Sequence, residues 1–323
     1  MRYSLLLVLT LCTAAWGGAE AAPEPGAPVR PAAPPLPDEV LQYYTHQSAR
    51  SDPGAYAKLY DTLPDDVSAL VSVVQGLLMH GALVEFYGYH PSKERTEAND
   101  AQVKTVEEML KRLQALDARP LTVTRPPEKR LLVCCRQIAL LLCSFLRAKH
   151  IPARVRCGYS TYTYGRGKFD NHWICEYWLA KERRWVRVDP QIDPMQRDLL
   201  GIKFDTLDVP PGSYLPAGQG WQRCRNGDVT PDRFGVGGPD WKGGDFGFVA
   251  SDTIRDFLCL NEYELLPWEL TPQLEQMIRR LDQTDLALVD HFAELAASAD
   301  VHFHLLRAEF EAMPGLRQAV KAK

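Results

Sequence analysis

The stretch LLVCCRQIALLLCSFLRAKHIPARVRCGYSTYTYGRGKFDNHWICEYWLAKERRWVRVDPQI, residues 131–192, decides the fold of this chain. It opens with an apolar segment that carries two adjacent cysteines, Cys134 and Cys135. Apolar residues occur on nearly every side of this segment when it is drawn as a helix, which is typical of a helix buried in a core. Because Pro152 cannot continue a helix, we expect this one to end near His150.

Strands are predicted after this helix. Residues 153–164, ARVRCGYSTYTY, alternate in polarity and are rich in β-branched and aromatic side chains. Residues 172–179 and 185–189 predict two further strands, and the charged turn between them indicates an antiparallel hairpin. In such a hairpin His172, which opens one strand, lies beside Asp189, which closes the next. The stretch therefore predicts an α+β fold, in which a buried helix bearing Cys135 packs on an antiparallel sheet.

Cys135, His172 and Asp189 are residue types that together suit nucleophilic catalysis by a thiol. The thiolate is the reactive form, and a helix N-terminus and a nearby imidazolium both stabilise it. A histidine that acts as a base needs its other nitrogen held by an acceptor, which Asp189 supplies. The backbone N–H of Cys135 would be one oxyanion donor, and the sequence identifies no second one.

These residues stand in motifs that resemble the core of the transglutaminase-like superfamily, a papain-like thiol fold. The superfamily includes transglutaminases, peptide N-glycanases and many bacterial proteins of unassigned activity. The resemblance implies that Cys135, His172 and Asp189 are catalytic, and we expect an exported bacterial member. The matching residues are Cys135-Arg136-Gln137-Ile138-Ala139, Leu146-Arg147-Ala148, Ile151-Pro152-Ala153-Arg154, Gly158-Tyr159, His172-Trp173 with Glu176, Trp185-Val186 and Val188-Asp189-Pro190.

Two positions depart from the family pattern. A glycine usually stands shortly before the cysteine, but Val133 and Cys134 precede Cys135 here. Cys134 therefore remains an alternative nucleophile, although the spacing to Ala139 favours Cys135. The tryptophan that usually follows the histidine by two positions is replaced by Ile174, which would alter the wall of the acyl pocket.

Helices are predicted on both sides of this core. We expect a helical flank at residues 38–120, the transglutaminase-like catalytic core at 121–195, a Gly/Pro-rich loop region at 196–250, and C-terminal helices at 251–323. Within the first flank, the apolar residues 67–89 predict one buried helix, and residues 97–116 predict an amphipathic one. The long loop region is expected to build a binding surface. Tyr162, Tyr164 and Lys168 precede His172 on a predicted loop that would touch substrate.

The N-terminus has the features of an export signal. Arg2 is followed by a short apolar segment and by the small-x-small site Ala19-Glu20-Ala21, which predicts a signal peptide at residues 1–21 and cleavage after Ala21. Residues 22–37 are a Pro/Ala-rich leader that cannot bury a core. We therefore expect an exported protein, periplasmic or secreted, without a membrane span. The net charge of −4 gives no reason to expect a nucleic-acid partner.

The cysteine count also constrains the site. Eight cysteines are present, and removal of Cys12 with the signal peptide leaves an odd number. At least one thiol is then unpaired in an oxidising compartment, and we expect it to be Cys135. Cys157 and Cys175 lie in strands that are predicted to be neighbours and are a candidate disulfide. The spacings match no zinc site, so no metal or cofactor is predicted.

Together these features predict a thiol enzyme that acts on amide or peptide carbonyls through a cysteine thioester. The substrate would be a protein or a peptide. We favour hydrolysis by a peptidase or amidase over amine cross-linking, because no device for excluding water is evident. The alternatives are a protein-glutamine acyltransferase, or an inactive peptide- or glycan-binding protein on the same fold. Glu176 is expected to be a salt-bridge partner within the sheet.

Overall fold

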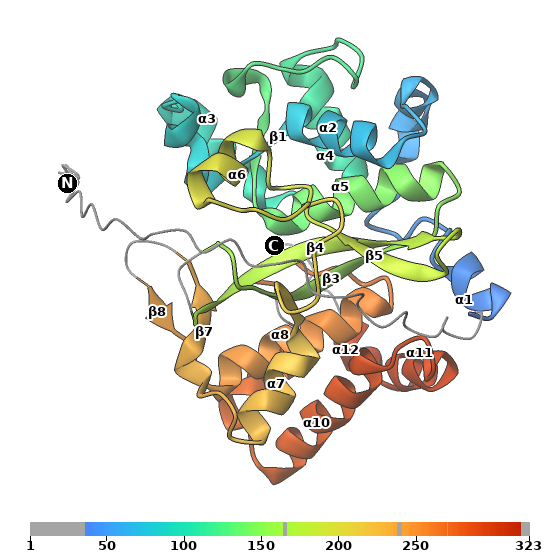
Figure 1. Ribbon diagram of the computed structural model, residues 1–323, viewed down its shortest axis with the longest axis vertical. Helices are drawn as coiled ribbons and strands as arrows, with labels where there is room; N and C mark the ends of the chain where they lie inside the picture. The colour runs from blue at the N-terminus through green and yellow to red at the C-terminus, as the bar shows by residue number, and fades with distance from the viewer. Residues whose placement is uncertain (1–35, 164–166, 238–240, 270, 318–323) are drawn as a thin grey trace, which may run out of the picture. The chain divides into compact units, whose positions relative to one another are not determined.

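The buried helix and the strands after it form the centre of the computed structural model, which describes residues 36–163, 167–237, 241–269 and 271–317. The predicted signal peptide and nearly all of the leader lie outside these residues. The fold is α+β, with helices packed against both faces of a largely antiparallel sheet (Figure 1). None of the described helices is both long and apolar enough to span a lipid bilayer.

Helix α5, Cys135–Ala148, begins where the sequence predicts and ends two residues before the expected His150. Every residue from Cys135 to Arg147 is buried, which agrees with the apolar residues found on nearly all its sides. His150 follows with a positive φ of 58° and ends the helix before Pro152. The helix packs on the two central strands, β3 (Ala153–Ser160) and β4 (Phe169–Leu179).

The main sheet has six strands in the order β6-β3-β4-β7-β8, and β5 also pairs with β4. The predicted hairpin is confirmed, because β4 and β5 pair antiparallel with Cys175 opposite Val188. Strand β4 begins three residues earlier than expected, so His172 lies inside it rather than at its start. The other strands of this sheet are β5 (Arg184–Val188), β6 (Tyr214–Pro216), β7 (Phe234–Val236) and β8 (Lys242–Gly243).

The N-terminal flank covers the face of the sheet on which α5 lies (Figure 1). The expected helix over residues 67–89 is wrong in its second half, because the chain leaves α2 and enters a short strand, β1, and then a 3-10 helix. β1 pairs in parallel with β2, which is distant in sequence. This pairing holds the second half of the apolar run in an extended conformation instead of a helix. The elements of this layer are α2 (Val67–Leu77), β1 (Leu78–His80), the 3-10 helix Gly81–Tyr87, α3 (Lys93–Glu97), α4 (Val106–Leu116) and β2 (Leu131–Val133). Helix α1 (Asp38–Tyr43) lies outside this layer and packs against Phe303.

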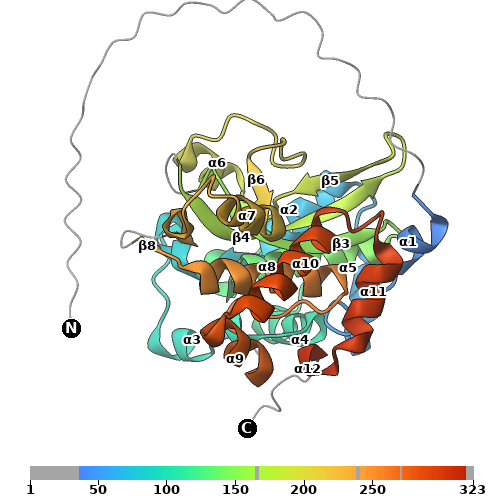
Figure 2. The same ribbon diagram turned by 90° about the horizontal axis from the view of Figure 1, so that it is seen from below.

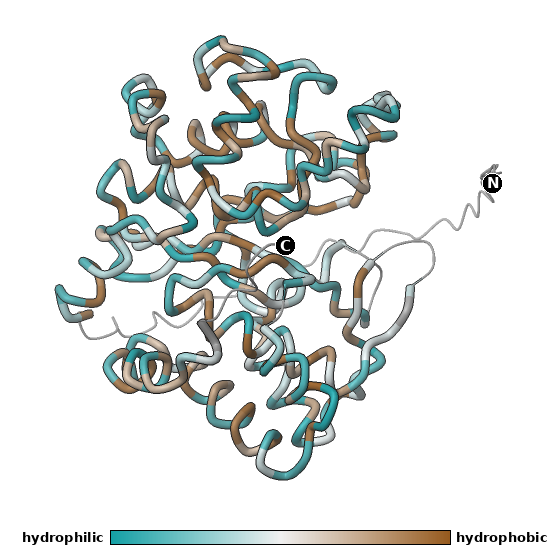
Figure 3. Tube along the Cα trace, turned by 180° about the vertical axis from the view of Figure 1, so that it is seen from behind, coloured by the Kyte–Doolittle hydropathy of each residue, from teal (hydrophilic) through white to brown (hydrophobic). Residues whose placement is uncertain are grey.

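The C-terminal helices cover the opposite face of the sheet (Figure 2). Helix α8 packs directly on β3, and α7 and α10 pack against α8. Two buried clusters of hydrophobic residues result, one on each face of the sheet, and the hydrophobic stretches of the chain run through the interior (Figure 3). The helices here are α7 (Ala217–Arg225), α8 (Phe246–Leu260), α9 (Pro272–Arg280), α10 (Gln283–Ala297), α11 (Phe303–Ala312) and α12 (Pro314–Arg317). Helix α6 (Pro194–Leu200) lies instead on the α2 side of the sheet (Figure 1).

The region expected to be a Gly/Pro-rich loop, residues 196–250, contains helix α7 and three strands as well as loops. Two glycines in α7 explain the difference. A Cβ on Gly220 would lie 2.8 Å from the ring of Tyr159, and one on Gly218 would lie 3.0 Å from the backbone of Ala293. These glycines allow α7 to approach β3 and α10 closely, whereas in the sequence they suggest a loop.

The candidate disulfide between Cys157 and Cys175 is not formed. Their strands are neighbours as predicted, but the register places Cys157 opposite Trp173, and Cys175 opposite Val155. The two cysteines are therefore not directly opposite each other. All seven cysteines of the described residues are free, so Cys135 is one of several unpaired thiols.

Candidate active site

The two adjacent cysteines lie at the start of α5. Cys134 is the N-cap residue, with an extended backbone that continues from β2, and Cys135 is the first residue of the helix. The side-chain oxygen Oε1 of Gln137 accepts the backbone N–H of Cys134 at 3.2 Å, as a capping-box residue does. The amide nitrogen of Gln137 donates to the carbonyls of Ala101 and Val103, which fixes the orientation of the amide. The helix start is thus held by the flank as well as by its own cap.

His172 and Asp189 meet as the hairpin predicts. His172 Nε2 lies 2.8 Å from Asp189 Oδ2, and both side chains are buried. Burial alone would lower the pKa of His172, but the Asp189 carboxylate outweighs it and raises that pKa. Burial would likewise raise the pKa of Asp189, while His172 and two further donors lower it. The pair therefore favours the protonated form of His172 and the ionised form of Asp189. Because Nε2 bonds to Asp189, the Nδ1 atom of His172 is the one that can exchange a proton with a reacting group.

Tyr162 is part of this arrangement. Its hydroxyl donates to Asp189 Oδ2 at 2.6 Å, and the backbone N–H of Gln191 donates to Oδ1 at 3.0 Å. The Tyr162 ring also lies edge-on to the His172 ring, with centroids 6.3 Å apart. The sequence suggested Tyr162 as a substrate contact, but the structure shows it as a residue that holds Asp189. Tyr164, named with it, lies outside the described residues, and Lys168 lies over the Trp241 ring.

Helix α5 brings the thiols to the strand that carries His172. The backbone N–H of Trp173, the next residue after His172, points to the sulfur of Cys135. Among the described residues, no hydrogen bond joins His172 to either thiol. The structure thus brings His172 and Asp189 into contact and places Cys135 against the neighbouring backbone. Cys135 is 7% exposed, while Cys134 is more accessible.

The two sulfurs have different environments. Burial would raise the pKa of Cys134, but a hydrogen bond from Cys135 and the N–H groups of Arg136 and Gln137 outweigh it and lower that pKa. The Cys134 sulfur, followed by burial, raises the pKa of Cys135. The sequence argument placed the benefit of the helix terminus on Cys135. In the structure it falls on Cys134, because the free N–H groups of a first turn point to the N-cap side chain.

A second contact acts against a negative charge on Cys134. Its sulfur lies 2.8 Å from Gln137 Oε1, and the amide of Gln137 cannot turn without losing its two backbone acceptors. An amide oxygen at this distance requires a proton on the sulfur, because two acceptors repel each other. The two thiols are therefore best described as one hydrogen-bonded pair with room for a single negative charge.

Two neighbours of His172 gave no signal in the sequence. Asp170 is buried on the same strand, where burial raises its pKa, and it accepts hydrogen bonds from Thr163 at 2.7 Å and from the backbone of Gly237 at 2.6 Å. Tyr214 places its hydroxyl 3.2 Å from the carbonyl oxygen of His172. Gly158 makes this possible, since a Cβ there would lie 2.7 Å from that hydroxyl. Contacts of this kind depend on the register of distant strands.

Glu176 lies on the same strand and is a salt-bridge partner within the sheet, as predicted. Its carboxylate receives Arg154 at 2.8 Å, and Arg156 and Arg187 at 3.1 Å each. Burial would raise its pKa, but the three guanidinium groups lower it far below its ordinary range. Glu176 therefore stabilises the sheet and is not placed as a catalytic acid.

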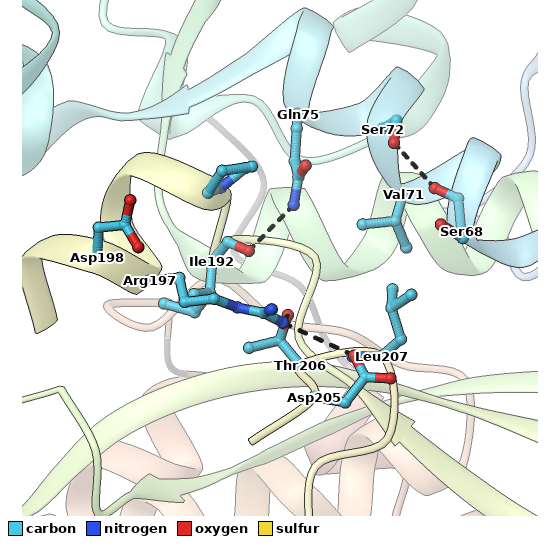
Figure 4. Close-up of a pocket in the computed structure, with 11 residues that line it drawn as sticks. Ser68, Val71, Ser72, Gln75, Ile192, Arg197, Asp198, Asp205, Thr206 and Leu207 are labelled. Atoms are coloured by element: carbon cyan, nitrogen blue, oxygen red, sulfur yellow. Dashed lines mark hydrogen bonds and ion pairs between the residues drawn. The ribbon is translucent and has the colours of Figure 1, made fainter. Parts of the chain in front are cut away.

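A cavity of about 270 Å³ lies between α2, α6 and the segment 205–207 (Figure 4). Ile192, three residues after Asp189, is part of its lining. Gln75 crosses one side of it and donates to the carbonyl of Ile192 at 3.2 Å. Arg197 closes another side through Thr206 and Asp205. The carbonyl of Thr206 also accepts the backbone N–H of Asp189, so this cavity adjoins the support of the His172–Asp189 pair. In the described part of the chain, no group of His, Cys, Asp and Glu side chains could hold a metal ion.

Comparison with known families confirms the resemblance. Residues 93–190 match the family model of the transglutaminase-like superfamily. The match begins in α3 and includes Cys135, His172 and Asp189. This part of the chain thus has the general fold of a thiol-dependent enzyme. No curated protein and no solved structure matches the chain.

Proposed function

We propose that this protein cleaves amide or peptide bonds through a thioester on Cys135, with water as the final acceptor. The observation that carries the proposal is the His172–Asp189 pair, buried beside the start of a helix that bears two thiols. This arrangement has the parts that acyl transfer requires: a nucleophile, a base and a group that orients the base. It lies within the region that matches the transglutaminase-like family model.

The chemistry would follow in two stages. The thiolate of Cys135 attacks the carbonyl carbon and forms a C–S bond, and the carbonyl electron pair moves to oxygen. When the tetrahedral intermediate collapses, the C–N bond breaks, and the His172 imidazolium gives its proton to the leaving amine. Water, deprotonated by the now neutral His172, then attacks the thioester, the C–S bond breaks, and the carboxylic acid leaves while the Cys135 thiolate and the His172 imidazolium are restored.

We assign the attack to Cys135 rather than Cys134 for two reasons. The Cys134 sulfur and its backbone N–H both bond to Gln137, so neither is free for a substrate. The Cys135 N–H is at the first position of the helix and has no partner among the described residues, so it can receive the oxyanion. Cys134 would tune the pair by exchanging a proton with its neighbour.

Alkylation by iodoacetamide tests the nucleophile, with variants Cys134→Ala and Cys135→Ala as a matched pair. We expect fast labelling of one thiol in the native protein, its loss in Cys135→Ala, and its retention in Cys134→Ala. His172→Ala should slow the labelling of Cys135 to the rate of an ordinary thiol. Labelling that stays fast in Cys135→Ala would instead make Cys134 the nucleophile, and equal slow labelling in all variants would rule out an activated thiol.

A peptide library incubated with a labelled primary amine tests the acceptor. Water gives shortened or deamidated peptides without label, and ammonia release with labelled peptides indicates a protein-glutamine acyltransferase. Mass spectrometry of the products separates the two outcomes. Hydrolysis is the expected result, since water is in large excess and an amine would need a site of its own.

A binding protein on the same fold is the alternative. It is favoured by the burial of Cys135 and by the raised pKa of its thiol. In that case the loops around β7 and β8 would hold a peptide or a glycan. Binding of library peptides without turnover, unchanged in Cys135→Ala, would support this alternative over catalysis.

A further inference from the structure

Strand β1 brings a second histidine to the start of α5. β1 and β2 run in parallel, and their register places His80 opposite Val133, the residue just before the two cysteines. Helix α5 also packs against β1. Figure 1 shows β1 in the helical layer on the α5 side of the sheet. A residue far from this stretch in sequence thus ends its strand opposite the residue that lies two positions before the candidate nucleophile.

A hydrogen bond fixes the tautomer of the neutral His80 ring. Its Nδ1 accepts the backbone N–H of Ala82 at 3.3 Å, so the proton of the neutral ring is on Nε2. Burial, and then the charge of His172, lower the pKa of His80 to about 4. The ring is therefore a neutral N–H donor at the pH values at which a thiol enzyme works. It is not a competing base, because no carboxylate of the described residues bonds to it as Asp189 bonds to His172.

The Nε2–H group of His80 has no hydrogen-bond partner among the described residues, and the side chain is partly accessible to solvent. The residue also lines a small cavity between α5 and the segment after Asp189, together with Ile138, Pro190 and Gln191. The charge of His172 is close enough to contribute to the lowered pKa of His80. An unpaired donor thus lies between the nucleophile's helix and the end of the His172–Asp189 hairpin.

We propose that His80 is the second oxyanion donor of this active site. Its Nε2–H and the backbone N–H of Cys135 would hold the negative oxygen that forms when the thiolate adds to the carbonyl. A neutral donor suits this role, since it stabilises the charge that develops in the transition state without protonating the thiolate. The proposal rests on the proposed function, and it names a catalytic residue that the motifs do not contain.

A simpler role for His80 is to cap the 3-10 helix Gly81–Tyr87 through Nδ1. Two substitutions separate the roles. In His80→Asn the amide oxygen takes the place of Nδ1, so the cap is kept and the distal donor is lost. In His80→Gln the longer amide reaches the place of Nε2, so a donor is kept and the cap is weakened. If His80 only caps the 3-10 helix, His80→Gln should lose more acylation activity than His80→Asn. If His80 is an oxyanion donor, His80→Asn should lose more.

The test compares two reagents on the full chain. p-Nitrophenyl acetate acylates the thiol through a tetrahedral intermediate and releases p-nitrophenolate as a burst, whereas iodoacetamide alkylates it by direct displacement and forms no oxyanion. We expect His80→Asn to lower the burst rate by about 10²–10³-fold, which is the usual loss for one oxyanion donor, and to leave the alkylation rate within about twofold. His80→Gln should keep the burst rate within about tenfold of the native protein.

Other outcomes overturn the proposal. A burst rate in His80→Asn equal to that of the native protein would remove His80 from the oxyanion site. So would equal losses in both variants, or a parallel loss of alkylation, which would indicate that His80 only supports the helix start. If the native protein itself shows neither a burst nor fast alkylation, the proposed function fails, and this result is distinct from a failure at His80.

Discussion

Two buried carboxylates, Asp189 and Glu176, lie close together on the β4–β5 hairpin and have different partners. Asp189 faces one imidazole, that of His172, and a tyrosine hydroxyl. Glu176, also buried, faces three guanidinium groups. Arginine does not lose its proton at any physiological pH, whereas histidine gives and takes a proton near neutrality. Burial is therefore common to both carboxylates, and what distinguishes Asp189 is a partner that can exchange a proton.

The largest expected effect is on the Asp189 side. Asp189→Asn keeps the shape of the side chain but removes the charge that stabilises the His172 imidazolium. We expect acylation by p-nitrophenyl acetate to fall by about 10⁴-fold, as when the acid of a catalytic triad is replaced. Stopped-flow measurement of the burst gives this rate. A fall of less than about tenfold would place Asp189 with Glu176, as a structural carboxylate.

The next largest effect is the loss of folding stability expected when Glu176 is replaced. Glu176→Gln removes the negative charge that compensates Arg154, Arg156 and Arg187. We expect the free energy of unfolding to fall by about 3–5 kcal/mol. Urea unfolding followed by circular dichroism measures this change. The control is Glu182→Gln, which breaks an exposed ion pair with Arg184 and should cost less than about 1 kcal/mol. Equal effects of the two substitutions would contradict a structural role for the Glu176 cluster.

A smaller effect is expected from Tyr162→Phe. The substitution removes a donor to Asp189, and the burst rate should fall by about tenfold while the thermal midpoint changes little. The pH dependence of alkylation should also shift, because the Asp189–His172 pair loses one of its supports. Tyr177→Phe is the control, since Tyr177 is a partly exposed residue of the strand that carries His172 and is opposite Val186 rather than at the His172–Asp189 pair. An unchanged pH profile in Tyr162→Phe would leave Tyr162 without a positioning role.

The smallest effect is a difference in the pH dependence of stability. The raised pKa of His172 means that its contribution is complete below an unfolded-state pKa near 6.5 and is lost as the pH rises through the folded-state pKa. The lowered pKa of Asp189 means that its contribution is complete above about 3.8 and is lost at lower pH. The pair therefore stabilises the fold most between about pH 4 and pH 6.5. Glu176, with its lowered pKa and arginine partners, contributes equally at all pH values above about 4.5.

Urea unfolding at about pH 6 and about pH 9 checks this difference. The stability lost in His172→Gln should be smaller at the higher pH, while the stability lost in Glu176→Gln should be the same at both. A loss in His172→Gln that does not change with pH would mean that the histidine is not charged in the folded protein.

The sequence predicts the parts of the site that depend on local patterns. Helix α5 is predicted because its apolar run is long and ends at Pro152, and the hairpin is predicted because a charged turn separates two strands. Strand β1 could not be predicted, since a short apolar run can be helix or strand until its partner is known. The place of His80 depends on that partner. The choice between the two thiols depends on the side chain of Gln137, whose direction is set by carbonyls in the flank.

Arg136, the residue after Cys135, limits which fragments of the chain can fold by themselves. Its guanidinium group donates to the carbonyl of Lys104 on one side and to the carbonyl of Glu264 on the other. The first turn of α5 is therefore tied to segments from both flanks. A fragment limited to residues 121–195 would contain every motif and yet lack these anchors, so we expect it to be unable to refold or act alone. The stretch at residues 131–192 is therefore not a portable module, and a graft of it into another protein would need both flanks.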